Sequence, residues 1–165
     1  MSCPNFRTQD DFPLFVTDIF DGYYTEDEDG EEVWIDWDSF MYHGLEADLE
    51  NFNEDLQFFK LTAEGGYYSG VQLMLEPDDP DRTLTKDFTP EEWRKYRKEA
   101  RDYPGSYYSW DFEYSYSEQK KLEQKEIRKI KEFCKTVLAK EYGFEEYACR
   151  GVFSNGEAVY EKVSG

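Results

Sequence analysis

The stretch from Asp18 to Asp55 constrains the fold of this chain more than any other. It reads DIFDGYYTEDEDGEEVWIDWDSFMYHGLEADLENFNED, with many carboxylates and aromatic residues but no Lys or Arg. Like charges held close together repel one another, and the repulsion costs stability unless a partner is gained. The stretch is therefore expected to hold its carboxylates outward while its apolar residues pack.

The negative charge lies in one half of the chain. Residues 1–81 contain 22 acidic residues and two basic ones, a net charge of −20, whereas residues 82–165 contain 16 acidic and 17 basic residues. The total net charge of −19 excludes nonspecific attraction to nucleic acid or to an anionic membrane. It favours a basic partner, a cation or high solubility.

Length and composition indicate one folded domain, residues 1–165, with an acidic half (1–81) and a charge-balanced half (82–165). Aromatic residues make up 19% of the chain, whereas a disordered acidic chain would be poor in them. The N-terminal sequence has no apolar signal segment, and no apolar run is long enough to span a membrane. Three cysteines without a CxxC pair do not suggest a secreted disulfide framework. We therefore expect a cytoplasmic protein, in the host cell if a phage encodes it.

The acidic half predicts two hairpins and a helix. Residues 13–24 and 32–37 alternate as strands do, and the Asp-Gly in the TEDEDGEE between them predicts a hairpin with an acidic tip. A helix capped by Asp38 or Ser39 is expected to run to Asp55, because its apolar residues recur at helical spacing. A second hairpin, residues 57–77, is expected to turn at Gly65-Gly66.

The charge-balanced half predicts two helices, a strand and a hairpin. Thr89-Pro90-Glu91-Glu92 is a capping box that starts a helix running to Tyr103. Residues 106–116 alternate aromatic and polar residues, which is typical of a half-buried strand. Ser115 or Ser117 caps the longest helix, which Gly143 ends, and Ser154-Asn155-Gly156 predicts the last hairpin.

These elements predict an α+β fold, in which an antiparallel sheet built from hairpins carries two to three helices packed on one face. A helix followed by a hairpin occurs at 38–76 and again at 117–163. A degenerate β-α-β-β duplication and a chance recurrence both account for this order.

No catalytic, metal or cofactor motif stands out. His43 is the only histidine, so any Ser-His-Asp or Cys-His site depends on it, and its position favours the surface. The chain lacks phosphate-binding glycine loops, zinc-ligand spacing and a motif that supports paired catalytic carboxylates. An EF-hand alignment with Gly30 in sixth place puts Thr25 first and Asp36 last, which are poor calcium ligands for those places. We predict a protein that is not an enzyme and binds no metal or cofactor.

The acidic surface is the predicted binding site. Proteins bind duplex DNA by setting Lys and Arg against phosphates, so carboxylates fixed at comparable spacing can occupy the same basic groove. Glu46, Glu50 and Glu54 would rise about 6 Å per step along a helix at ~1.5 Å per residue. The predicted partner-binding residues are Asp18, Asp21, Glu26, Asp27, Glu28, Asp29, Glu31, Glu32, Asp36, Asp38, Glu46, Asp48, Glu50, Glu54 and Asp55.

In size, acidity and compact α+β pattern, the chain resembles phage and mobile-element inhibitors of bacterial defence that imitate DNA, such as antirestriction and anti-CRISPR proteins. The resemblance is one of charge and size and transfers no residues. It implies an inhibitor whose partner is a basic nucleic-acid-binding protein, such as a nuclease or a CRISPR effector. No direct contact with nucleic acid or membrane is expected.

Other functions stay open at this point. A small ligand could bind an aromatic pocket around Trp93, Trp110 and Tyr114, or the acidity could serve only solubility. The basic helices at 94–101 and 120–140 could touch nucleic acid, although interleaved glutamates favour a solvated, ion-paired face. The basic half could also dock on the acidic half, within one chain or across a homodimer.

Overall fold

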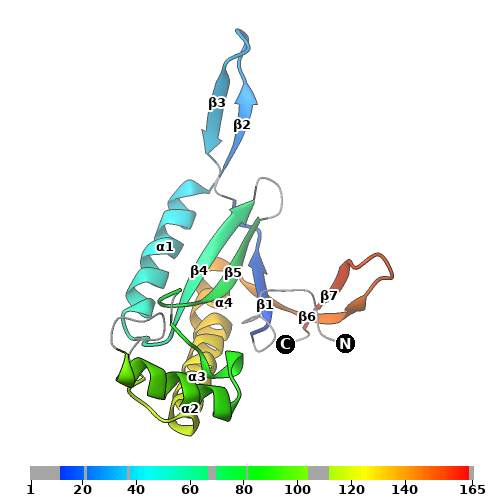
Figure 1. Cartoon of the computed structure of the whole chain (residues 1–165). Helices are drawn as coiled ribbons and strands as arrows, with labels where there is room; N and C mark the ends of the chain where they lie inside the picture. The colour runs from blue at the N-terminus through cyan, green and yellow to red at the C-terminus, as the bar shows by residue number, and fades with distance from the viewer. Residues whose placement is uncertain are drawn as a thin grey trace.

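The computed structural model describes residues 12–20, 22–36, 38–66, 70–80, 82–103 and 112–163. Its main sheet has five antiparallel strands in the order β4-β5-β1-β6-β7 (Figure 1). These are β1 (Leu14–Thr17), β4 (Phe59–Gly66), β5 (Gly70–Pro77), β6 (Glu145–Val152) and β7 (Ala158–Lys162). A separate hairpin of β2 (Gly22–Glu26) and β3 (Glu32–Asp36) extends away from the main body (Figure 1).

In the described part of the chain, three helices accompany the sheet, as predicted. They are α1 (Ser39–Asn53), α2 (Pro90–Asp102) and α3 (Tyr116–Phe133), and α3 continues through the π-helical segment η3 (Cys134–Leu138) into α4 (Ala139–Tyr142). A short 3₁₀ turn, η2 (Thr85–Asp87), precedes α2. The predicted caps of α2 and α3 are confirmed, because Thr89 and Glu92 form a capping box, Ser115 caps α3, and Gly143 is left-handed at φ 73°. Asp38 occupies the N-cap position of α1, but its side chain makes no capping hydrogen bond there.

The core lies between one face of the sheet and helices α1 and α3. Leu45 and Leu49 of α1 are buried together with alternate residues of β4 and β5 and with the apolar stripe of α3. Across this core, the rings of Phe52 and Phe133 stack with centroids 4.0 Å apart. The packing of helices on one face of an antiparallel sheet confirms the predicted α+β class.

Two predicted boundaries in the acidic half were wrong. Residues 13–24 do not form one strand: β1 enters the centre of the main sheet, whereas β2 belongs to the separate hairpin. Alternation of apolar residues is the same in both strands, so it does not show that the chain changes sheet between them.

Gly65 and Gly66 pair with Val71 and Gly70, so they are strand residues and do not form the predicted turn, and residues 67–69 lie outside the described residues. The strand predicted at 106–116 lies largely outside them too. Its described end is not a strand, because Tyr116 opens α3 and Phe112 packs edge-on against Trp93.

The order of helix followed by hairpin does occur twice, as α1-β4-β5 and as α3-β6-β7 with α4 between. In the described residues from 112 onward, no strand precedes α3. The second predicted β-α-β-β unit therefore lacks its first strand in that part of the chain.

Candidate protein-binding surface

The acidic tip of the β2–β3 hairpin is a tightly bonded turn. The Gly30 amide donates to the Asp27 carbonyl at 3.0 Å, and Gly30 adopts the left-handed conformation at φ 79°. One carboxylate oxygen of Asp27 accepts from the amides of Asp29 and Glu31, both at 2.9 Å. The hydrogen bonds fix the backbone that carries the carboxylates of residues 26–32.

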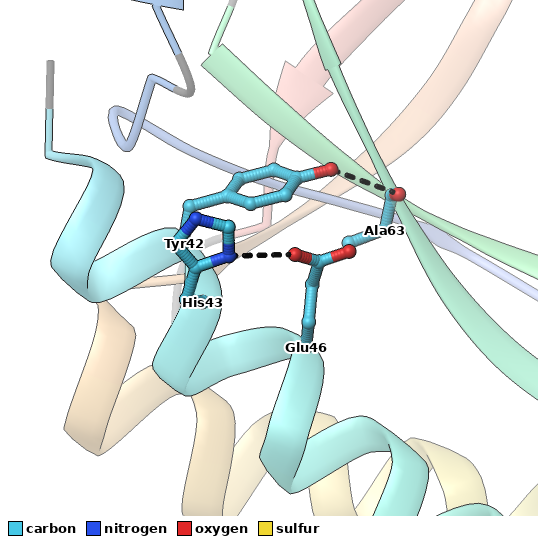
Figure 2. A network of polar contacts seen from close by, with 4 residues as sticks. All are labelled: Tyr42, His43, Glu46 and Ala63. Atoms are coloured by element: carbon cyan, nitrogen blue, oxygen red, sulfur yellow. Dashed lines mark hydrogen bonds and ion pairs between the residues drawn. The ribbon is translucent and has the colours of Figure 1, made fainter. Parts of the chain in front are cut away.

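Helix α1 continues the acidic surface from the base of the hairpin. Glu46, Glu50 and Glu54 are all exposed, and successive members lie one helical turn apart. Figure 2 shows how the N-terminal part of α1 is held: the Tyr42 hydroxyl donates to the Ala63 carbonyl of β4 at 3.5 Å. His43 Nδ1 lies 3.2 Å from Glu46 Oε1 on the exposed side of the helix (Figure 2).

The structure places the predicted partner-binding residues in three groups. Asp21 lies outside the described residues. Asp48 is half-buried and accepts a hydrogen bond from the Tyr142 hydroxyl, so it joins α1 to α4. The other residues are exposed: Asp18, Glu26, Asp27, Glu28, Asp29, Glu31, Glu32, Asp36, Asp38, Glu46, Glu50, Glu54 and Asp55.

These exposed carboxylates are hardly neutralised. In the described part of the chain, His43, which lies beside Glu46, is the one basic side chain within ion-pairing distance of any of them. Lys60, the one Lys or Arg of the acidic half that lies among the described residues, is instead paired with Glu76 at 3.9 Å. The hairpin and α1 therefore present one long, unneutralised acidic surface, which we call the hairpin–helix surface.

Trp93, which was predicted to line an aromatic pocket, is buried in the described part of the chain. Its side chain is 1% exposed and lies among the rings of Phe88, Phe112 and Tyr116. Tyr114 accepts a hydrogen bond from Gln57 at its hydroxyl, and Trp110 lies outside the described residues. Trp93 therefore packs in the interior between α2 and α3.

The opposite half carries a basic groove that sequence reasoning missed. The groove has a volume of about 770 Å³ and contains a buried carboxylate, Glu123. Its charged rim consists of Lys86, Lys120, Arg128 and Lys131. Glu123 and Gln119 lie one and two helical turns before Ile127, on the side of α3 that Ile127 and Ile130 bury. This spacing was the signal in the sequence that could have shown that Glu123 is buried.

Glu123 links α3 to η2. Its carboxylate accepts from the Thr85 hydroxyl at 2.6 Å, from the Thr85 amide at 3.2 Å and from Gln119 Nε2 at 2.8 Å. Burial raises the pKa of the Glu123 carboxyl, and its hydrogen bonds with Thr85 and Gln119 offset part of this rise.

The Glu123→Gln variant tests this raised pKa. The folded protein binds the proton of Glu123 more tightly than the unfolded chain does. The protonated Glu123 therefore contributes fully to stability at pH values below the ordinary pKa of glutamate. That contribution is lost as the pH rises through the raised pKa. We expect the stability of the wild type relative to Glu123→Gln, measured by urea denaturation, to fall as the pH rises from the ordinary pKa of glutamate through the raised pKa of Glu123. A difference that stays constant over this range would contradict the assignment.

The cysteines and the helices bear on the predicted localisation. In the described residues, Cys134 is buried and free, and Cys149 is disulfide-bonded. A disulfide is uncommon in a reducing cytosol, so a cytoplasmic location stays a prediction.

No helix among the described residues has the length and apolarity that crossing a bilayer requires. The same residues contain no cluster of three or more His, Cys, Asp or Glu side chains able to hold a metal ion.

Comparisons with protein-family models, with curated proteins and with solved structures find no match for this chain.

Proposed function

We propose that this protein is a non-enzymatic inhibitor that binds the basic nucleic-acid channel of another protein by imitating the charge of nucleic acid. The partner is a nuclease or CRISPR effector, and the function is of the anti-defence type. The observation that supports this proposal is the hairpin–helix surface, where exposed carboxylates are held on ordered backbone with almost no charge pairing. Binding a basic partner to such a surface is favourable, because the partner's charges relieve the repulsion between the carboxylates.

The geometry suits a channel better than a flat surface. The hairpin extends beyond the main sheet, and α1 continues from its base, so the two elements that carry the carboxylates follow each other along the molecule (Figure 1). Successive glutamates of α1 rise about 6 Å per turn, which sets negative charges at regular intervals along a groove. Lys and Arg side chains that normally contact phosphates would meet carboxylates instead.

The test is binding to a panel of purified nucleases and a CRISPR effector. We expect at least one member to bind, to be released by a short DNA duplex, and to bind more weakly at high salt. The triple variant Glu46→Lys, Glu50→Lys, Glu54→Lys is expected to lower the affinity about 100-fold, since three charge pairs of roughly 1 kcal/mol each are lost.

A matched control separates this surface from net charge. Glu132, Glu141 and Glu157 are exposed acidic residues in the charge-balanced half, and none makes a charge pair in the described part of the chain. The triple variant with lysine at these positions changes the net charge by the same amount and is expected to keep the affinity. Equal loss in both variants, or binding that neither salt nor duplex DNA weakens, would contradict the proposal.

A further inference from the structure

The β2–β3 hairpin has an open face that combines aromatic rings with carboxylates. Its two strands form a sheet of their own, clear of the main body (Figure 1). In its antiparallel register, Tyr24 lies opposite Trp34, and Glu26 lies opposite Glu32. Directly opposed and alternate residues share a face, so both pairs and Asp36 stand on the same side of the hairpin.

The aromatic pair is held in place although it is exposed. Tyr24 is 50% exposed and Trp34 is 38% exposed, and their rings meet edge to face with centroids 4.8 Å apart. The indole N–H of Trp34 donates to the Asp36 carboxylate. The indole also lies against the backbone of Gly22, where an added Cβ would come within 2.4 Å of Trp34 Cζ2. Three neighbours therefore fix the ring before any partner arrives.

The carboxylates around the pair need a cation. Glu26 and Glu32 face each other across the strands, and like charges in that position are destabilising. Asp36 lies on the other side of the aromatic pair, so negative charge flanks the rings at both ends. A cation placed over the rings would meet their negative faces and relieve the repulsion between the carboxylates.

We propose that this face binds an arginine side chain of a basic partner protein, with the guanidinium over Trp34 and Tyr24 and hydrogen-bonded to a flanking carboxylate. Arginine fits this site because its planar guanidinium both stacks on aromatic rings and pairs with carboxylates through a rigid fork of donors. The inference deepens the proposed function and rests on it, since it names the contact that anchors the hairpin within the basic channel.

An octa-arginine peptide serves as the probe. At low salt, we expect it to shift the Trp34 indole resonance, which the Trp34→Phe variant identifies by its absence from the NMR spectrum. The double variant Tyr24→Leu, Trp34→Leu keeps every carboxylate and is expected to bind the peptide about tenfold more weakly, in line with a cation–π contribution of about 1–2 kcal/mol. Phe40→Leu is the matched control, because Phe40 is 89% exposed but stands outside this face.

The outcomes separate the two proposals. Suppose that the double variant Tyr24→Leu, Trp34→Leu keeps its affinity for the octa-arginine peptide, while the triple lysine variant of α1 loses affinity for it. The arginine site is then wrong and the proposed function stands. If neither variant lowers the affinity for the peptide, both proposals are wrong. Equal affinity and equal indole shifts with octa-lysine would overturn the preference for arginine. Hairpin amide shifts that are retained in the double variant would show that this variant folds. If it does not fold, Trp34→Phe tests the site instead, and we expect this variant to bind the peptide more weakly than the wild type, by less than tenfold.

Discussion

Replacing Gly70 by alanine is expected to destabilise the protein by at least about 3 kcal/mol. Gly70 begins β5 in the left-handed conformation, at φ 74°, which side chains rarely adopt. A Cβ at this position would lie 2.0 Å from the Thr17 carbonyl oxygen of β1. That oxygen belongs to a backbone paired with β5, so the clash is not relieved by turning a side chain.

The position of β1 explains why the effect should be large. β1 is the central strand and pairs with β5 on one side and β6 on the other. If β1 shifts to make room for the methyl group, both ladders are disturbed, together with Phe15, which is 1% exposed in the core. The cost therefore adds lost strand pairing and packing to the backbone strain.

Gly156→Ala is the matched control for Gly70→Ala. Gly156 is also left-handed, at φ 91°, but an added Cβ would meet no atom within 4 Å. We expect it to lose only the conformational term, about 1 kcal/mol, when both variants are compared by urea denaturation. Equal losses of stability at the two positions would show that the close approach of β1 to Gly70 does not contribute to the effect.

Sequence patterns predicted the local elements well, because their signals are local. The cap of α2 is formed by Thr89 and Glu92, three residues apart, and Gly143 ends α4 through its own backbone conformation. The hairpin at residues 153–157 likewise forms where Asn155-Gly156 predicted it. In each case the residues that determine the structure are neighbours in the chain.

The long-range features were not predictable in this way. Asp48 was predicted as a partner-binding residue, yet the Tyr142 hydroxyl that it bonds is 94 positions away. The pairing of Tyr24 with Trp34 depends on the strand register, which the predicted hairpin did not specify. The sequence could thus identify the acidic surface, but not which of its members the fold already uses.

Glu126 is a further long-range contact, and it supports the last prediction. The sequence suggested an ion-paired glutamate on a solvated helix face. Instead, its carboxylate accepts from three successive backbone amides at the start of β4: Gln57 at 3.1 Å, Phe58 at 3.0 Å and Phe59 at 3.3 Å. These bonds join α3 to the edge strand of the sheet, next to side chains of Phe58 and Phe59 that are nearly fully buried.

Glu126→Ala is therefore expected to lower the free energy of unfolding by about 3 kcal/mol, since it leaves these amides without their charged acceptor. Glu126→Gln keeps one acceptor oxygen but turns an N–H₂ group toward the amides, so we expect about half that loss. Urea denaturation measures the stability, and amide exchange at Phe58 and Phe59 should accelerate in the alanine variant. Glu132→Ala, at an exposed position on the same helix, should change stability by less than about 0.5 kcal/mol. If Glu126→Ala behaved like Glu132→Ala, the contact would not hold α3 to β4, and the apolar packing of Ile127 and Ile130 would have to do so alone.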